Sequence, residues 1–387
     1  MFDLYSGNTP SRLNKEHFKG TVNWISSGEL KEHYIYSSKE QISEEAAKSL
    51  KLLPVGTFVI AIYGLEADGV RGTGSITQEP STISQACMSF IPKGVIENEF
   101  LYSWYKKHGN VIGIRYAQGT KQQNLSYDIL EKFRIAYPNT KEQEKLNKFI
   151  SLLDERIATQ NKIIEDLKKL KSAIIEKVFC SPNQKNPMCR IEGFEQALST
   201  YKMSDFSSRI ATKNKDSKCS LVLTIAAQYG LVNQESFFNK SVASENLTGY
   251  YLLHKGEFAY NRSYSAGYDW GTVKRLDNYD QGVLSTLYIC FKINEIIVDS
   301  DYLAYYFESS KWHKGLSDIA GEGARNHGLL NVSMTDYFNT KHRFPVIEEQ
   351  KAIAKMLNTI AEKERKATLL GECYQKQKQY LLCQMFT

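Results

Sequence analysis

Apolar residues recur at alternating steps of four and three along two long segments of the chain, one central and one C-terminal. A period of 3.5 residues sustained over four heptads predicts a coiled-coil helix, because it keeps one apolar seam on the same side of the helix. The central helix would be on the order of 50 Å long. Its seam positions are Leu146, Ile150, Leu153, Ile157, Ile164, Leu167, Ile174 and Val178, and Gln160 and Lys171 interrupt the series.

The C-terminal segment keeps the same register. Its seam positions are Ile353, Leu357, Ile360, Ala367, Tyr374, Leu381 and Met385, and Glu364 and Gly371 weaken the series. Two exposed seams on one chain predict that the helices pack against each other. Two amphipathic helices that each cover their own domain are the alternative, which the periodicity leaves open. The positions expected to pair the helices and to bind a partner are Leu146, Ile150, Leu153, Ile157, Ile353, Leu357, Ile360 and Tyr374.

Outside these helices the hydrophobic pattern is mostly that of short β-strands. The runs TFVIAIYG, ACMSFIP, FAYNRSY and LYICFKI are rich in β-branched and aromatic residues and are bounded by Gly, Pro, Asn or Ser. Helical patterns are fewer and lie near Glu44, Leu101 and Leu303. Because the strands do not alternate regularly with helices, the pattern predicts an α+β fold.

The chain also repeats itself at a shift of about 200 residues, which grows slowly toward the C-terminus. LLPVGTFVIA from Leu52 aligns with LLHKGEFAYN from Leu252, and YPNTKEQEKLNKFI from Tyr137 aligns with FPVIEEQKAIAKML from Phe344. In the second pair, each passage carries a glutamine five residues after its proline. Because the matches stay collinear, we infer two copies of one unit, each a globular part followed by a helix. Accidental similarity between unrelated halves is the alternative.

Candidate DNA-contacting residues lie in glycine-containing loops at equivalent places in the two copies. Arg, Asn and Gln can hydrogen-bond base edges in the major groove, and glycine lets the backbone approach a phosphate closely. Solvated loops are also rich in these residues, which is the alternative at any single position. Lys121 and Arg325 occupy equivalent positions, so two sites of one construction would recognise different sequences. The candidates are Ser27, Gly28, Arg71, Thr73, Lys121, Gln122, Gln123, Asn124, Gln228, Tyr229, Arg262, Tyr264, Arg325, Asn326 and His327.

Composition changes this picture only slightly. The 387 residues suffice for two or three domains, and a formal net charge of +6 is compatible with a polyanionic partner without being diagnostic. The seven cysteines form no CxxC pair, as expected for reduced thiols in the cytoplasm. The N-terminal segment has no apolar h-region, and no apolar stretch approaches the length of a membrane span. We therefore expect neither secretion nor membrane insertion.

No catalytic motif is present in the sequence. Methyl transfer to an amino group would require a glycine-rich cofactor loop and an (N/D)PP(Y/F) tetrapeptide, and a motor would require a P-loop. The seven histidines show no metal-ligand spacing. The charged residues of ERIATQNKIIEDLKK lie on the predicted coiled-coil helix, where they form its solvated face. We expect a chain that is not an enzyme and that has no cofactor and no metal site.

The order of these segments resembles that of the specificity (S) subunit of type I restriction-modification systems. The resemblance covers nearly the whole chain and depends on the repeat, on GNTPS from Gly7, and on the two proline-to-glutamine passages. It implies two similar α+β target recognition domains, at residues 1–140 and 201–343, each binding one half of a bipartite, asymmetric DNA sequence. It also implies that helices at 141–180 and 344–387, with 181–200 as a linker, pair as an antiparallel coiled coil in an internal pseudo-twofold repeat and act as a spacer.

The resemblance further implies partners and leaves two alternatives. The implied partners are double-stranded DNA, two DNA methyltransferase (modification) subunits, and restriction or motor subunits. Members of that family begin with a tryptophan-containing lead-in before their G-x-TPS segment, whereas this chain starts almost on it. We therefore expect a shortened edge strand in the first domain or a start downstream of the true one. The alternatives are the recognition subunit of a type IIB-like enzyme and a non-enzymatic, protein-binding scaffold.

Overall fold

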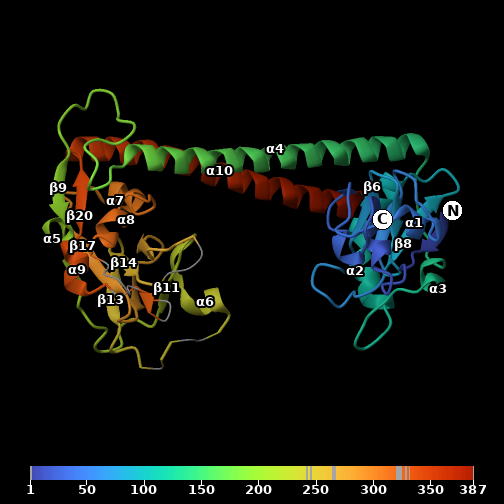
Figure 1. Ribbon diagram of the computed structural model, residues 1–387, viewed down its shortest axis with the longest axis horizontal. Helices are drawn as coiled ribbons and strands as arrows, with labels where there is room; N and C mark the ends of the chain where they lie inside the picture. Colours follow the sequence, from blue (N-terminus) through green and yellow to red (C-terminus); the bar gives the residue numbers. More distant parts are fainter. Residues whose placement is uncertain are drawn as a thin grey trace. The chain divides into compact units, whose positions relative to one another are not determined.

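The computed structural model describes residues 2–240, 243–244, 246–263, 267–319, 325–326, 329–330 and 332–386 (Figure 1). The chain divides into two compact units. Unit 1 comprises Met1–Asn161 and Leu369–Thr387, and unit 2 comprises Lys162–Thr368. Each unit therefore contains a globular part and one portion of each long helix.

The two predicted coiled-coil helices are α4 (Thr140–Val178) and α10 (Ile347–Met385), each 39 residues long. Within unit 1, the guanidinium of Arg156 donates to the Tyr374 hydroxyl at 2.7 Å. In the same unit, Asp154 of α4 pairs with Lys378 of α10. Residue numbers therefore rise along α4 as they fall along α10, and the helices run antiparallel as predicted.

The predicted seams are the faces that the helices bury. Every predicted seam position is buried or half-buried. In unit 1, Ile150 lies in one core with Phe386, and in unit 2, Ile175 lies in one core with Leu357. The prediction that the two helices pack together is confirmed.

Unit 1 is built on a five-stranded sheet of order β1-β8-β5-β6-β3 and a three-stranded sheet of order β4-β2-β7. Its pairs are antiparallel except β3 with β6 and β2 with β7, which are parallel. The helix α2 packs on β5 and β6. The elements are β1 (Phe2–Ser6), η1 (Lys15–Phe18), β2 (Val22–Ile25), η2 (Ser27–Glu29), β3 (Tyr34–Ile35), β4 (Gln41–Ile42), α1 (Glu44–Lys48), β5 (Phe58–Ala61), β6 (Gly74–Thr77), β7 (Ser81–Ile83), β8 (Cys87–Pro92), α2 (Asn98–Tyr116) and α3 (Tyr127–Leu130).

Unit 2 is built on a four-stranded sheet of order β10-β17-β14-β15, with the two-stranded pairs β11-β12, β13-β16, β18-β19 and β20-β9. Each of these pairs is antiparallel. The elements are β9 (Ser199–Lys202), α5 (Met203–Phe206), β10 (Ser207–Arg209), β11 (Leu223–Ala226), β12 (Gly230–Asn233), α6 (Gln234–Phe238), β13 (Tyr251–His254), β14 (Phe258–Asn261), β15 (Thr272–Arg275), β16 (Gln281–Leu284), β17 (Ile289–Ile293), α7 (Ser300–Tyr306), α8 (His313–Ser317), β18 (Arg325–Asn326), β19 (Leu329–Leu330), α9 (Met334–Asn339) and β20 (Lys341–Phe344).

The two units share the strand pairing that the sequence repeat predicts. Phe58 of β5 lies opposite Phe90 of β8 in unit 1, and Phe258 of β14 lies opposite Phe291 of β17 in unit 2. All four rings are buried. The turn before each of the strands β5 and β14 contains a glycine with positive φ, Gly56 or Gly256. The two copies therefore share the register of their strand pairing as well as their sequence pattern.

The repeated glutamine performs the same task in both units. Gln143 is fully buried; its Oε1 accepts from the amide of Glu97, which is the N-cap of α2, at 2.9 Å. Its Nε2 donates to the carbonyls of Val95 and Pro138. Gln350 likewise accepts from the N-cap of α7 and donates to a carbonyl before that helix and to the carbonyl of the preceding proline. The passage is repeated because each globular part is joined to its long helix by this side chain.

The edge strand of unit 1 is not shortened, so the first of the two expectations about the N-terminal segment is wrong. The strand β1 pairs with β8 over five residues, whereas its counterpart β10 pairs with β17 over three. The difference between the units lies elsewhere. In unit 2, β9 pairs with β20, but the equivalent segment of unit 1, residues 134–137, has no strand partner among the described residues.

His342 is expected to make unit 2 sensitive to acid. Burial lowers the pKa of His342 to about 3, and its imidazole contacts the hydroxyls of Tyr306 and Thr340 at 3.1 and 2.8 Å. The unfolded chain takes up this proton below about pH 6.5, and the folded one does so only near pH 3, so stability is lost as the pH falls between these values.

The free energy of unfolding of unit 2 should therefore fall by about 2 kcal/mol between pH 7 and pH 5 because of this residue. Denaturant unfolding at both pH values checks this. His342→Gln should reduce the pH dependence, and His254→Gln, whose side chain is 58% exposed, should leave it unchanged. Equal pH dependence in all three proteins would contradict the assignment.

Two kinds of feature are absent from the described part of the chain. No helix there combines the length and the apolar character needed to cross a bilayer. In the same residues, no three His, Cys, Asp or Glu side chains gather in a way that could hold a metal ion.

Candidate nucleic-acid interface

The three predicted loop regions of unit 1 come together at one end of its strands. The carbonyl of Ile25, at the end of β2, accepts from the amide of Ser84 at 2.8 Å. The amide of Ile62, just after β5, donates to the carbonyl of Ala86 at 2.9 Å, and the Ile62 carbonyl accepts from the amide of Leu125 at 2.9 Å. This series of hydrogen bonds links the loop after β2, the loop after β5 and the loop between α2 and α3.

Arg71 and Gln123, two of the predicted contact residues, meet within this cluster of loops. The Arg71 guanidinium donates to Oε1 of Gln123 at 2.8 Å, and the Gln123 amide donates to the Glu66 carboxylate at 2.8 Å. The hydrogen bond from the Gln123 backbone lowers the pKa of Glu66. An acidic side chain that the sequence analysis did not single out therefore orients the loop that carries Gln123.

Glycines of α2 make room for the loop that contains Arg71. A Cβ on Gly113 would lie 2.6 Å from Cγ of Arg71, and a Cβ on Gly72 would lie 2.7 Å from the amide nitrogen of Asn110. Gly72 also has a φ of +70°, which favours glycine. Gly109 and Gly113 are not among the residues predicted from the sequence, although their four-residue spacing on a helix was an available signal. Only the fold shows which loop lies against them.

The loop between α2 and α3 presents Lys121 and Gln122 to solvent. Its two ends are joined by reciprocal backbone hydrogen bonds between Gln118 and Asn124, of 2.8 and 2.9 Å. Gly119 has a φ of +108°, and a Cβ there would lie 2.1 Å from the Gln122 carbonyl oxygen. The side chains of Lys121 and Gln122 are exposed, whereas Asn124 is half-buried. The loop is thus closed at its base and offers its tip to a ligand.

Two further predicted positions of unit 1 are less available. Ser27 and Gly28 form the short helix η2, which is closed by hydrogen bonds from Ser26 to the Glu29 carboxylate; Gly28 is exposed. The hydroxyl of Thr73 donates to the Val70 carbonyl at 2.7 Å. The Thr73 hydroxyl therefore already donates its hydrogen bond within its own loop. Gly28 has no side chain and could contact DNA only through its backbone.

In unit 2, Gln228 and Tyr229 occupy the turn of the β11–β12 hairpin, the position that corresponds to Ser27 and Gly28. Both side chains are exposed, and Tyr229 is 68% exposed. Arg262, in contrast, is engaged in hydrogen bonds within unit 2. Its guanidinium donates to the carbonyls of Leu287 and Val332, both at 3.3 Å, so it holds two loops together instead of extending into solvent.

A hollow of about 760 Å³ in unit 2 places Gln228 and Tyr229 beside basic residues that the sequence analysis did not select. Lys168 and Lys171 line it from α4, and Lys274 lines it from β15. Lys171 pairs with Glu364 at 3.1 Å, whereas Lys168 and Lys274 make no ion pair within the described structure. Glu176, Glu308 and Glu364 line the hollow as well, so its suitability for a nucleic-acid strand depends on the amide and aromatic side chains and on the two lysines that make no ion pair within the described structure.

The remaining candidates of unit 2 are described only in part. Arg325 and Asn326 form β18, whose backbone pairs with Leu330 and Leu329 of β19, and their side chains lie outside the described structure. Tyr264 and His327 lie outside the described residues altogether.

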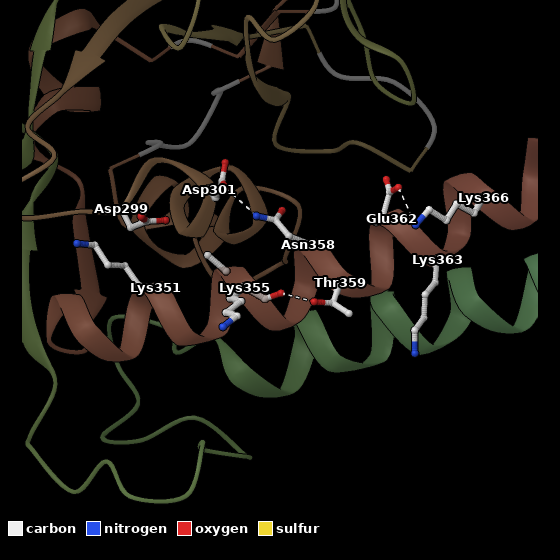
Figure 2. A pocket seen from close by; sticks show the side chains of 10 residues that line it. Asp299, Asp301, Lys351, Lys355, Asn358, Thr359, Glu362, Lys363 and Lys366 are labelled. Atoms are coloured by element: carbon white, nitrogen blue, oxygen red, sulfur yellow. Dashed lines mark hydrogen bonds and ion pairs between the residues drawn. The ribbon is translucent and has the colours of Figure 1, made fainter.

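A second hollow of unit 2, of about 580 Å³, lies along α10 (Figure 2). Lys351, Lys355, Lys363 and Lys366 line it. Figure 2 shows Asn358 turned toward Asp301, to which it donates at 2.7 Å, and it also accepts from the Tyr305 hydroxyl at 2.8 Å. These bonds attach α7 to α10. Because no aromatic side chain of the described residues lines this hollow, the hollow that contains Tyr229 is the better candidate for contact with bases.

The N-terminal part of the chain, less than half of its length, matches a known protein family. Residues 1–169 match the family model described as the type I restriction modification DNA specificity domain. The MjaIX type I restriction enzyme specificity subunit of Methanocaldococcus jannaschii is 29% identical over 183 residues, 46% of this chain and 41% of the relative. The EcoR124I/EcoR124II specificity subunit of Escherichia coli is 31% identical over 168 residues, 42% of this chain and 40% of the relative. The chain thus spans about two fifths of the length of these curated relatives.

Solved structures are similar over almost the entire chain. The type I restriction-modification S subunit from M. genitalium superposes with a TM-score of 0.52 and 15% identity, covering 100% of this chain and 94% of the other. A structure described as the basis of complex assembly and conformational transition of the type I R-M system superposes with a TM-score of 0.56 and 14% identity, covering 93% and 90%. At these identities the likeness establishes the fold.

Proposed function

We propose that the chain is the DNA specificity subunit of a type I restriction-modification complex, because its residues 1–169 match the model of the type I restriction modification DNA specificity domain. In this role it recognises a bipartite, asymmetric DNA sequence and recruits the subunits that methylate and cleave. Each unit contacts one half of the target. The chain itself supplies no catalytic residue.

One observation carries this proposal: two units of the same construction present unlike side chains at the same place. Ser27 and Gly28 follow β2 in unit 1, and Gln228 and Tyr229 follow β11 in unit 2. The central strands of the two units pair in the same register, and each pairing places two buried phenylalanines opposite each other. A shared framework with different exposed loops is what two half-sites of unlike sequence require.

Contacts with the DNA divide into two kinds in this proposal. Lysines such as Lys168 and Lys274 neutralise phosphates, which gives affinity that falls steeply with salt and does not depend on sequence. Amide and cationic side chains at the loop tips, among them Gln122 and Gln228, contact base edges. Arg262 positions its loops through backbone carbonyls and acts on DNA only indirectly.

Partner subunits bind the paired helices in this proposal. Exposed apolar side chains remain on both helices away from the seam, and they include Phe149, Leu152, Ile163, Leu170, Leu369 and Leu370. Two modification subunits, one for each half of the pseudo-twofold repeat, are expected to cover such positions, and the restriction or motor subunits join that assembly. Co-purification of the chain with its modification subunit, and loss of the subunit on Leu152→Glu, would test this placement.

Changing the loop tip of unit 1 should relax one half of the target only. Replacing Lys121 and Gln122 together by alanine removes donors that contact base edges, at about 1–3 kcal/mol for each good contact. Methylation sequencing of a host that expresses the variant with its partner subunits should show tenfold or greater loss of discrimination in the first half-site. The second half-site should keep its sequence, and Gln228→Ala should give the reverse pattern.

Lys93→Ala is the matched control. The loops gather near Cys87, at the start of β8, whereas Lys93 follows the other end of that strand. The Lys93 side chain is 59% exposed. It should leave both half-sites unchanged. If the Lys121 and Gln122 variant weakened both halves equally, those residues would contact the DNA backbone generally and the assignment would be wrong.

A further inference from the structure

Gln123 of unit 1 is held by three hydrogen bonds from the connection between β5 and β6. Its amide donates to the Glu66 carboxylate at 2.8 Å, and its carbonyl accepts from the amide of Leu65 at 3.2 Å. Its side-chain Oε1 accepts from the Arg71 guanidinium at 2.8 Å. Gln123 directly follows the exposed tip of its loop, residues 121–122. The three bonds therefore fix the end of the loop from which the tip projects.

Arg71 is itself fixed against the helix α2, which packs on β5 and β6. A Cβ on Gly113 of that helix would lie 2.6 Å from Cγ of Arg71 and 2.9 Å from its Cδ, so the stem fits because residue 113 is glycine. Gly113 is buried, and Nε of Arg71 is also buried, without a hydrogen-bond partner within the described structure. The stem of Arg71 is thus held by the helix, and its Nη2 donates to Gln123.

An arginine of the equivalent connection makes a similar attachment in unit 2. Arg262 directly follows β14, the counterpart of β5, and donates to the carbonyls of Leu287 and Val332, both at 3.3 Å. Val332 belongs to the passage NVS, which the repeat aligns with the passage NLS that follows Gln123. Unit 2 therefore uses a backbone acceptor where unit 1 uses the Gln123 side chain. In both units, an arginine between the same two strands holds the neighbouring recognition loop.

We propose that Arg71 is a positioning residue for the first half-site: it fixes the direction of the loop tip through Gln123 and does not itself contact DNA. Side chains that contact a ligand need such support from residues behind them. The effect on DNA rests on the proposed function, because the direction of the tip matters only if the tip contacts bases. The attachment of the loop by Arg71, in contrast, is a property of the free protein and can be measured without DNA.

Removing the guanidinium of Arg71 should loosen the loop in the free protein. Arg71→Met keeps an unbranched stem against Gly113 but has no donor for Gln123. Exchange of the hydrogen-bonded amides within residues 118–124 should become at least tenfold faster, while exchange in β5 and β8 should stay as in the parent. Arg115→Met is the matched control, since Arg115 is an exposed arginine of α2 that makes no hydrogen bond or ion pair within the described structure.

A second variant displaces Arg71 without removing its charge. Gly113→Ala forces Cγ of Arg71 to move, because the new Cβ would lie 2.6 Å from it. This variant should loosen the loop as Arg71→Met does, and unchanged exchange in β5 and β8 would show that unit 1 remains folded. Gly94→Ala is the matched control, since a Cβ on Gly94 meets no atom within 4 Å. It should leave the exchange of the loop unchanged.

On DNA, a positioning residue and a direct contact give different results. In the complex with its partner subunits, Arg71→Met should relax discrimination at least tenfold at the same bases as the Lys121 and Gln122 double variant. Combining all three changes should add nothing further, because both act through one loop tip. Loss of a phosphate contact lowers the slope of log affinity against log salt by about one, so Arg71→Met should leave this slope unchanged. Lys274→Ala, which removes a proposed phosphate contact, should lower it.

The two measurements separate the role of Arg71 from the proposed function. Loop exchange that Arg71→Met leaves unchanged would overturn the positioning role, whatever the chain binds. So would a lower salt slope for this variant, or relaxed discrimination at bases that the double variant does not affect. A loop that loosens as expected, in a chain whose complex methylates no bipartite target, would instead overturn the proposed function and leave the attachment by Arg71 established.

Discussion

Replacing Gln350 by leucine is expected to lower the free energy of unfolding of unit 2 by about 3–5 kcal/mol. The side chain is 1% exposed and makes hydrogen bonds to one amide and two carbonyls, those of Asp299, Ile297 and Pro345. Leucine fills the space but leaves these groups buried and unpaired. Gln143→Leu should weaken unit 1 comparably, because Gln143 makes the equivalent three bonds.

Hydrogen exchange followed by mass spectrometry reports the two units separately and so measures each loss. Gln375→Leu makes the same change at an exposed position of α10 and should stay within about 0.5 kcal/mol of the parent. Gln350→Glu keeps the acceptor but places a buried carboxylate against the two carbonyl oxygens that accept from Gln350, so at neutral pH its effect should be at least as large as that of Gln350→Leu. Losses at Gln143 and Gln350 no greater than the control would show that the repeated motif has no structural role.

Shortening both long helices by one heptad is expected to abolish methylation of the original target and to create a new target with the same half-sites. Deleting residues 158–164 from α4 and 367–373 from α10 keeps both apolar seams in phase, since each loss is one full repeat. The helix pair becomes about 10 Å shorter, which is close to the rise of three base pairs.

In the proposed function the helix pair sets the gap between the half-sites, so the gap should shorten by about three base pairs. Methylation sequencing of the host returns the half-sites and the gap together. Deleting the heptad from α4 alone is the control. The apolar seams of the two helices then differ in length and no longer match, so methylation should fall at every site. An unchanged gap in the double deletion would reject the spacer role and leave the recognition roles of the units untouched.

The register between the two helices illustrates where sequence reasoning stops. The heptad pattern predicted both helices and their seams, since a local period is independent of the rest of the fold. It recorded Lys171 and Glu364 as separate interruptions. The structure pairs them at 3.1 Å, with side chains only 22% and 17% exposed. Whether these two residues pair depends on the register between the two helices. That register is set by the packing of each globular part against its helices.

The candidate contact residues show the same limit. Composition directed attention to loops with Arg, Lys, Asn, Gln and Gly, and the structure gathers those of unit 1 at one end of its strands. The pattern could not separate Lys121, which is exposed, from Arg262, which binds two backbone carbonyls. Nor could it associate Lys168 on α4 with Tyr229 in a hairpin turn, because their meeting depends on contacts between segments far apart in the chain.

By itself, therefore, the sequence determined what periodicity and repetition encode: two long paired helices, a duplicated α+β unit, and a glutamine repeated at the start of each long helix. These features repeat at fixed intervals along the chain, so no knowledge of distant contacts is needed to recognise them. Tertiary structure alone decided which loops meet, which lysines line a hollow, and which backbone groups before α2 and α7 hydrogen-bond to the repeated glutamine. Each of these depends on the packing of residues that are remote in sequence, for which a linear pattern carries no signal.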